Sequence, residues 1–387
     1  MPQKMSQQTK NELLGKLRSR YARAGKKHKS KILDQVQDLV GLHRKSAIRA
    51  LTRQPQLAIS VPTMIGRPLT YDPEELVPVL RPIWLAAQQP CGRRLVAMLP
   101  DWIPAYEEDH KRLGSDVRQA LLKASAATLD RLLQPLRVQF GRGPGGTKPG
   151  SLLRQEIPIR GGLWEEDKPG WLEVDTVALC GGRLDDQHSW MLDCVDICTH
   201  WVEMRGLENR SQERTLAQLQ DIERQLPFAW LGMDSDNGGE FLNWHVVHWC
   251  AQRARPVRMT RARPYHKNDN AHVEQRNYTH VREWFGYERY ENPAVVPLIN
   301  QLCTGALGQL LNYFMATMKL LRKEQVGSRI KRIYGKAQTP YARLIASDAV
   351  TTAKKAELER QRQKLNPLSL AREVQKQLKH IDQCRRA

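Results

Sequence analysis

The sequence has few cysteines and no long apolar run, and each shortage excludes a class of protein. Its seven cysteines form no CxxC pair and no signal peptide precedes them, so we expect no disulfides and a reducing, cytoplasmic location. No stretch reaches the roughly 18 uninterrupted apolar residues of a membrane helix, since even "LVPVLRPIWLAA" is broken by Arg81. We therefore expect no membrane role.

What the sequence has in excess is positive charge. Its 387 residues carry a formal net charge of +20. The excess lies at both ends, with 14 Lys and Arg against 3 Asp and Glu in residues 1–55, and 12 against 5 in residues 336–387. Each basic side chain that meets a phosphate releases condensed counterions, so the ends predict a nucleic-acid partner. The nearly neutral middle is the better place for a metal site.

Residues 29–53 have the spacing of two helices separated by a turn at Gly41, which is typical of a helix-turn-helix. The alternative is a plain basic helical hairpin. We interpret residues 1–55 as a DNA-binding domain. The apolar positions of the two predicted helices are Ile32, Val36, Leu39, Ala47, Ile48 and Leu51, and the predicted DNA contacts are Arg44, Lys45, Arg49 and Arg53.

Composition divides the rest of the chain. Residues 56–137 are predicted to be a second helical domain, either another DNA-reading unit or a structural hairpin. Within it Ser125 resembles the N-cap of a helix that carries Leu129, Leu132 and Leu133 on one side. Residues 138–160 are rich in Gly, Pro and basic side chains and predict a linker. A catalytic core (161–335) and a basic helical C-terminal region, solvated or facing DNA (336–387), are expected to follow.

The core alternates strand-like and helix-like segments. Residues 170–181, 189–198 and 200–208 predict three consecutive strands, because they are short, rich in Trp, Val, Leu and Ile, and separated by turn signals. Residues 211–226 predict a helix, 228–234 a strand and 268–285 a helix. This order indicates an α/β layered fold with a mixed sheet.

Three segments of this core place acids where apolar residues are expected. Asp175 lies in the middle of the first strand, on the same face as Glu173, and "GMDSDNGGEF" (232–241) collects acids where a strand meets a glycine turn. A buried carboxylate without a partner is costly, so each should meet a cation or a cluster of hydrogen bonds. Glu274 falls, at 100° per residue, inside the apolar arc formed by Val273, Asn277, Tyr278, Val281, Trp284 and Phe285.

Carboxylates from different segments, in a chain otherwise suited to phosphates, fit a pair of hard divalent ions. Magnesium takes oxygen ligands and leaves positions open for water and phosphate oxygens. Two such ions roughly 3.5–4 Å apart stabilise the attacking and the leaving oxygen of a phosphodiester reaction. The expected cofactor is therefore two Mg²⁺ ions, with Mn²⁺ as a substitute.

The blocks "EVDTV", "DSDNGGEF" and "KNDNAHVEQRN" resemble the three signature blocks of the DDE transposase and retroviral integrase superfamily. The stretch from about 170 to 345, including "TPYARL", resembles bacterial insertion-sequence transposases and, among them, the ISNCY group. The resemblance implies a ribonuclease H-like core with a five-stranded mixed sheet. It carries the catalytic, metal-binding acids onto Asp175, Asp236 and Glu274. Their 236–274 spacing is slightly longer than the superfamily's, which implies a small insertion.

The other acids near these three blocks are expected to have structural roles. Strand geometry alone cannot choose between Asp234 and Asp236, and the resemblance chooses Asp236. Glu240 is expected in the first turn of the next helix, where the helix dipole favours an acid. Asp193 and Asp196 are expected to be strand-edge or turn hydrogen-bonders, with an approach to the metals as the alternative. Asp269 is expected to be a helix cap.

The remaining metal-binding and basic residues are judged by spacing. His245, His248 and Cys250 do not share one helix face and lack a fourth ligand, so we interpret them as residues of an amphipathic helix and not as a zinc site. Lys267, directly before the predicted helix, is expected to hold a DNA phosphate.

The resulting hypothesis is a DNA transposase that binds the terminal inverted repeats of an insertion element, cuts the DNA and transfers the strand to target DNA. Its partners would be double-stranded DNA and, because two ends must be joined, further copies of itself in the nucleoid. The alternatives are a metal-dependent nuclease without strand transfer and an inactive relic that regulates by binding DNA.

Overall fold

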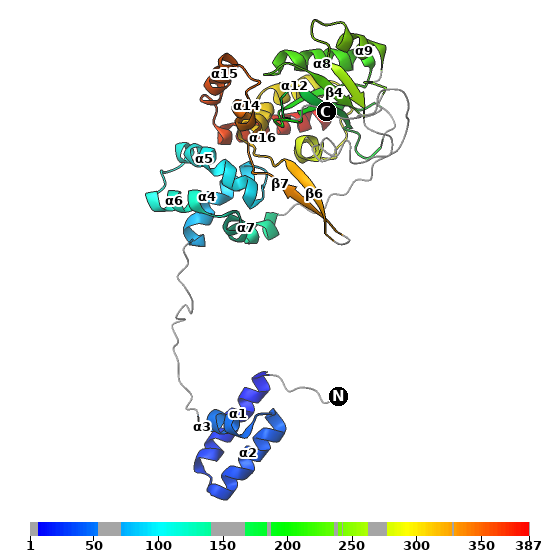
Figure 1. The fold of residues 1–387 in the computed structure, drawn as a ribbon. Coiled ribbons are helices and arrows are strands. Elements are labelled where there is room, and N and C mark those ends of the chain that lie inside the picture. Colours follow the sequence, from blue (N-terminus) through cyan, green and yellow to red (C-terminus); the bar gives the residue numbers. More distant parts are fainter. Residues whose placement is uncertain are drawn as a thin grey trace. The chain divides into compact units, whose positions relative to one another are not determined.

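The computed structural model describes residues 7–52, 71–140, 167–183, 187–235, 239–241, 243–261, 277–326 and 329–386. The chain folds as two compact units, Met1–Leu69 and Thr70–Ala387 (Figure 1). Within the described ranges, no helix is both long and apolar enough to cross a membrane.

The described residues of the first unit form three helices, α1 (Gln7–Arg23), α2 (Lys26–Val40) and α3 (Arg44–Thr52). The predicted turn is confirmed, because Gly41 ends α2 with φ 75° and donates its N–H to the carbonyl of Gln37. Glycine adopts this left-handed conformation without a Cβ penalty. Leu39 and Ile48 were predicted to be apolar positions of these helices, but both side chains are exposed. Helix α1, which was not predicted, packs against α2 and α3 and helps to determine which of their residues face inward. The core consists of Leu14, Leu17, Ile32, Leu33, Val36, Val40, Ala47 and Leu51.

The second unit begins with four helices, α4 (Pro73–Ala86), α5 (Gly92–Asp109), α6 (Ser115–Lys123) and α7 (Ala126–Phe140). Ser125 caps α7 as predicted, since its hydroxyl accepts the N–H of Thr128 at 3.1 Å. The sequence separates these helices from the core by a linker, but they share one compact unit with the sheet. The reason is packing: the indole of Trp102 on α5 is buried and donates to the carbonyl of Phe314, more than 200 residues later.

Five strands form one mixed sheet in the order β3-β2-β1-β4-β5. The three predicted consecutive strands are confirmed as an antiparallel meander, and β4 and β5 continue the sheet parallel to β1. β4 begins four residues later than predicted, where Gly232 pairs with Trp171. A Cβ on Gly232 would lie 2.0 Å from the Trp171 ring, so only glycine fits there. The strands are β1 (Trp171–Ala178), β2 (Trp190–Asp196), β3 (Val202–Leu207), β4 (Gly232–Ser235) and β5 (Arg258–Arg261).

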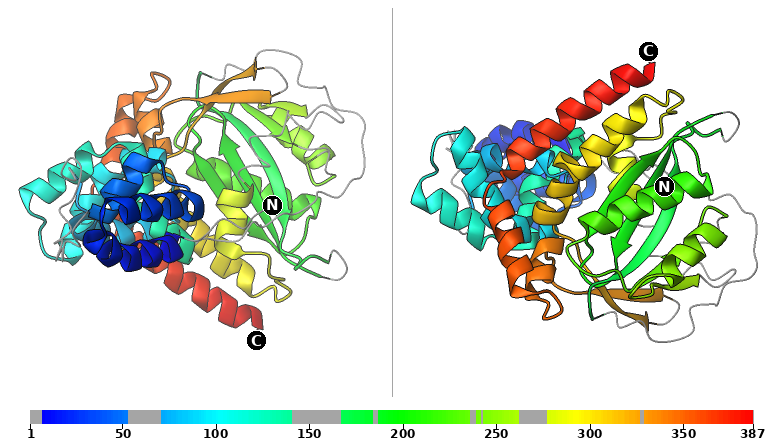
Figure 2. Two further views of the ribbon diagram at one scale, coloured as in Figure 1. Left: turned by 90° about the horizontal axis from the view of Figure 1, so that it is seen from below. Right: turned by 90° about the horizontal axis from the view of Figure 1, so that it is seen from above.

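Helices cover both faces of this sheet (Figure 2). On one face lies α8 (Gln212–Gln225), whose Asp221 binds Arg205 of β3, and next to it α9 (Trp244–Ala251). On the other face lies α12 (Val295–Thr304), whose Asn300 accepts the N–H of Gly206. Asp175 points to this second face, because Gly206, Met191 and Asp193 follow the same side of the pleat.

The helix predicted for 268–285 is described only from residue 277, as a π-helical segment η1 (Asn277–Arg282) and a short α11 (Glu283–Phe285). Val281, Trp284 and Phe285 are buried as predicted, but Tyr278 is 40% exposed. The difference arises because a π-helix forms i to i+5 hydrogen bonds, so 100° per residue no longer describes which side chains face inward.

The C-terminal region is helical as predicted, but it is not merely solvated. Helix α16 (Pro367–Arg386) packs against α12, α13 (Ala306–Gln309) and α5, because Leu368, Ala371, Val374 and Ile381 form one buried stripe. The C-terminal region also contains α14 (Pro340–Ala346) and α15 (Thr352–Arg362). Between α13 and this region, the end of the predicted core forms η2 (Leu310–Phe314) and the hairpin of β6 (Leu320–Val326) and β7 (Arg329–Tyr334).

Candidate functional site

Four carboxylates from three adjacent strands share one face of the sheet. Asp175, near the middle of β1, lies directly opposite Asp193 of β2, and directly opposite residues of an antiparallel pair point to the same side. Glu173 precedes Asp175 by two residues and therefore shares that face. Across the parallel pair, Glu173 lies opposite Asp234 of β4. The central strand thus has an acidic neighbour on each side.

Only one of these four acids is partly open to solvent. Glu173, Asp193 and Asp234 are at most 2% exposed, whereas Asp175 is half-buried. Buried carboxylates remain in folded proteins when they are paired or hydrogen-bonded. Asp234 meets this condition inside the sheet, because the hydroxyl of Thr260 on β5 donates to its Oδ1 at 2.6 Å. Asp175 is the member of the set that a substrate can reach.

The segment η1 holds the acidic face through two side chains. Asn277 donates from its Nδ2 to Oδ2 of Asp175 at 2.5 Å, and the backbone N–H of Thr176 donates to Oδ1 at 2.8 Å. His280, one turn later, places its Nδ1 3.0 Å from Oδ2 of Asp193. An ionised carboxylate only accepts, so Nδ1 is the donor in this pair. Both contacts orient the carboxylates by hydrogen bonds from one short segment.

Glu240 takes a different place from the one predicted. It lies in the turn before α9, four residues ahead of the first helical residue, and Asn243 is the N-cap of that helix. Glu240 is buried and accepts from the hydroxyl of Thr176 at 2.8 Å and from Arg210 at 3.1 Å. The prediction of a first-turn acid is therefore wrong. Because Thr176 follows Asp175, this ion pair supports the central strand from the opposite face of the sheet.

Strand β2 carries two acids, Asp193 and Asp196, which have separate roles. Asp196 is a turn hydrogen-bonder, as predicted, and accepts from the N–H of Gly170 at 2.7 Å and from the N–H and hydroxyl of Thr199 at 2.6 Å each. Burial raises the pKa of Asp196, and these hydrogen bonds oppose that shift. Asp193 is neither at a strand edge nor in a turn, as was predicted. It is fully buried in an interior strand because His280 supplies a partner for its charge.

Of the three acids that the superfamily resemblance selects, the structure describes Asp175 alone. Asp236 and Glu274 lie outside the described residues, as do Arg53, Lys267 and the predicted helix cap Asp269. Their described neighbours along the chain are Ser235, which pairs with Val174, and Asn277, which contacts Asp175.

The predicted DNA-binding residues that are described lie on α3 of the first unit. Lys45 and Arg49 are exposed. Arg44 is 43% exposed and forms an ion pair with Asp34 of α2 at 2.6 Å, and it also donates to the hydroxyl of Ser30. Arg44 therefore joins α3 to α2, which leaves Lys45 and Arg49 as the fully available cations of this set.

Within the part of the chain that is described, no group of three His, Cys, Asp or Glu side chains is arranged to hold a metal ion. The donor chemistry of the acidic face nevertheless suits a hard cation, because its donors are carboxylate oxygens. His245, His248 and Cys250 lie on α9, where Cys250 is buried and burial raises its pKa to about 12. A thiol held protonated is a poor ligand for zinc.

Three contributors to this face were predicted chiefly for other roles or not at all. Asp193 was assigned to an edge or turn, Asn277 was counted as part of an apolar arc, and His280 was not considered. A signal was present for Asn277, because an amide inside an apolar arc calls for a partner just as Glu274 does. No signal in the sequence pairs His280 with Asp193, since 86 residues separate them.

The chain is similar in sequence to a bacterial protein and in structure to a chain of a viral complex. No protein-family model matches the sequence. The "Uncharacterized protein y4rM" of Sinorhizobium fredii (strain NBRC 101917 / NGR234) is 34% identical over 355 residues, which cover 89% of this chain and 97% of that protein. A chain of the simian T-cell lymphotropic virus intasome, solved in complex with PP2A regulatory subunit B56 gamma, is 14% identical and matches 55% of this chain and 70% of its own length. The TM-score of this match is 0.30.

Proposed function

We propose that this chain, which belongs to the same family as the Sinorhizobium fredii protein y4rM, is a DDE-type DNA transposase. The proposed reaction is cleavage of a phosphodiester bond at the end of an insertion element, followed by attack of the freed 3′ hydroxyl on target DNA. A five-stranded mixed sheet between helices, the architecture that the superfamily resemblance implies, supports this proposal. So does the basic, helical first unit, which would bind the element ends.

The observation that carries the proposal is the hydrogen bond from Asn277 to Asp175. Glu274 precedes Asn277 by three residues in the sequence. Asp236 directly follows Ser235, whose strand partner Val174 is the neighbour of Asp175. The described residues that come nearest along the chain to both remaining acids of the signature therefore lie beside Asp175.

Asp175, Asp236 and Glu274 would hold the divalent metal ions of this reaction. Bound Mg²⁺ or Mn²⁺ would supply Lewis acidity and would neutralise charge on the phosphate oxygens. The chain itself supplies orientation. Asn277 and the N–H of Thr176 restrict the Asp175 carboxylate, and Glu240 with Arg210 supports Thr176 from behind. A carboxylate held in one rotamer binds a cation at less entropic cost.

Metal dependence tests the proposal directly. Labelled duplexes from the DNA that flanks the reading frame should be cleaved and joined to target DNA in Mg²⁺ or Mn²⁺, and EDTA should stop both steps. A zinc-selective chelator should leave both steps unchanged, because the proposed ligands are carboxylates. Cleavage without any joined product would identify a simple nuclease, and the absence of both products in Mg²⁺ and Mn²⁺ would refute the transposase.

DNA binding by α3 makes a separate prediction. Replacing Lys45 and Arg49 together by alanine should weaken end binding and should reduce the slope of log K against log salt by about 2, since each phosphate contact contributes nearly 1. Replacing the exposed Lys26 and Lys27 of α2 is the matched control, because it removes the same charge from another helix of the same unit. Equal losses in the two double variants would show that net charge, and not α3, determines binding.

A further inference from the structure

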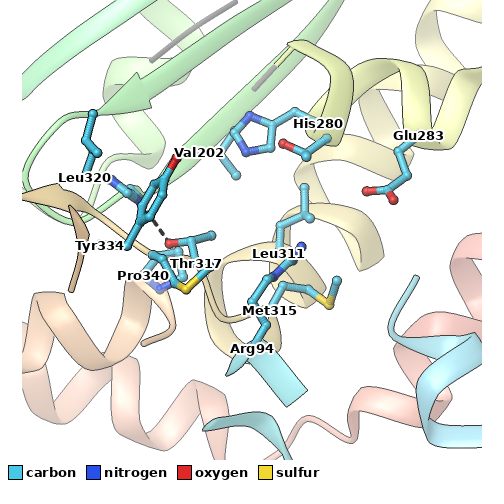
Figure 3. Close-up of a pocket in the computed structure, with 13 residues that line it drawn as sticks. Arg94, Val202, His280, Glu283, Leu311, Met315, Thr317, Leu320, Tyr334 and Pro340 are labelled. Carbon is cyan, nitrogen blue, oxygen red and sulfur yellow. Dashed lines mark hydrogen bonds between the residues drawn. The ribbon is translucent and has the colours of Figure 1, made fainter. Parts of the chain in front are cut away.

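A cavity of about 330 Å³ lies beside the acidic face (Figure 3). Its walls come from α5, η1, α11, η2, the β6–β7 hairpin and the start of β3. It shares one wall with the site already described, because His280 lines it and also binds Asp193, the strand partner of Asp175. A ligand in this cavity would therefore lie one side chain away from the acidic face.

The side chains of Arg94 and His280 face each other across the cavity. Figure 3 shows Arg94 on one side and His280 on the opposite side. The Nε of Arg94 donates to the carbonyl of Ala316 at 2.6 Å, which fixes the guanidinium, and its Nη groups make no hydrogen bond within the described residues. The imidazole of His280 is fixed by Asp193 through Nδ1, which leaves Nε2 on the side away from that carboxylate.

Burial has a larger effect on the pKa of the Arg94 guanidinium than the neighbouring charges have. Burial lowers the pKa of Arg94, and the nearby charge of Glu283 only partly offsets this effect. A guanidinium at this position still carries its charge at neutral pH and offers a planar fork of donors, which matches phosphate. Glu283 also lines the cavity, so the Nη donors of Arg94 are the specific point at which an anionic group would be held.

The rest of the cavity wall is mostly apolar. Leu311, Met315, Met318 and Leu320 line it, and Tyr334 of β7 contributes an aromatic ring. Thioether and aromatic side chains pack well against the flat face of a nucleobase. The volume lies at the small end of the range for ligand sites, which admits one nucleotide and excludes a duplex.

We propose that this cavity binds one unpaired nucleotide of the DNA substrate, with its base against Met315, Met318 and Tyr334 and its phosphate at Arg94. The inference rests on the proposed function for the identity of the substrate, but the cavity itself contains no member of the proposed triad. It would separate the terminal nucleotide from its complement and hold the neighbouring phosphate near Asp175.

The test is binding of deoxyadenosine monophosphate to the full chain, measured by calorimetry. We expect saturable binding, with deoxyadenosine at least tenfold weaker because it lacks the phosphate that Arg94 would contact. Arg94→Gln should weaken the nucleotide by roughly tenfold and leave deoxyadenosine unchanged. Arg93→Gln, which removes an exposed charge from the same turn of α5, is the matched control and should bind as the unaltered protein does.

Several outcomes would overturn the inference. The unaltered protein could fail to bind the monophosphate saturably, or could bind nucleotide and nucleoside with equal affinity. The Arg93 and Arg94 variants could also lose equal amounts of affinity for the nucleotide. The first two comparisons use the unaltered protein, so misfolding of a variant cannot hide the result. Asp175→Asn separates this inference from the proposed function: it should keep nucleotide binding and lose cleavage. Nucleotide binding with cleavage unaffected by Asp175→Asn would refute the transposase alone.

Discussion

Asp175→Asn, Asp236→Asn and Glu274→Gln should each abolish end cleavage and strand transfer while DNA binding and folding stay nearly intact. Each change keeps the shape of the side chain and one carbonyl oxygen but removes the negative charge that holds a divalent cation. Loss of one member of a catalytic unit typically lowers the rate by about a thousandfold or more. Labelled element ends incubated with Mg²⁺ measure both steps, and a thermal melt of each variant checks the fold.

The same assay contains its own controls. Asp234→Asn should retain substantial activity, because Asp234 is buried and held by Thr260 within the sheet. Combining two of the three substitutions should cost little more than either one, since residues that act as a unit are not additive. If Glu274→Gln still joined ends to target DNA, or if Asp234→Asn were inactive while Asp236→Asn was active, the assignment of the triad would be wrong.

Arg205→Met should have the largest effect on stability. Arg205 is 1% exposed, and its Nε donates to Asp221 at 2.8 Å while Nη1 donates to Glu203 at 3.2 Å. Glu203 is itself only 11% exposed. Removing one member of a buried ion pair leaves an uncompensated charge, which costs about 3–5 kcal/mol. Chemical denaturation at pH 7 should show a fall of this size in the free energy of unfolding.

The pH dependence of this loss follows from Glu203. Burial raises the pKa of Glu203, and Arg205 opposes that shift, so Arg205→Met should raise the pKa further. An acid whose pKa is higher in the folded state destabilises that state as the pH rises above the unfolded value of about 4.3. The difference between variant and unaltered protein should therefore be largest at neutral pH and should shrink as the pH falls through the raised pKa.

Arg224→Met is the matched control for Arg205→Met. Arg224 binds the same carboxylate, Asp221, at 2.9 Å, but its side chain is 66% exposed. An exposed ion pair contributes about 1 kcal/mol or less. A cost for Arg224→Met equal to that for Arg205→Met, or a loss in Arg205→Met that does not change with pH, would contradict the role assigned to buried charge.

Local patterns in the sequence determined much of the secondary structure. The meander of β1, β2 and β3, the turn at Gly41 and the cap at Ser125 were all predicted, because period-two alternation, a left-handed glycine and a capping hydroxyl act over a few residues. Local patterns failed where a contact with a distant segment determines which residues are buried. One face of α16 is buried because it packs against α5 and α12. Leu39 is exposed because α1 packs against α2 and α3 and contributes to the core of the first unit.

The same distinction applies to the candidate site. The sequence alone identified Asp175 as an acid in a central strand, since an acid interrupts an apolar strand pattern wherever the chain folds. Only the tertiary structure placed Asp193 opposite it, brought Asn277 within 2.5 Å of it and paired His280 with Asp193. The two contacts of Asn277 and His280 join residues 102 and 87 positions apart. Their geometry is set by strand register and helix packing, which no short stretch of sequence encodes.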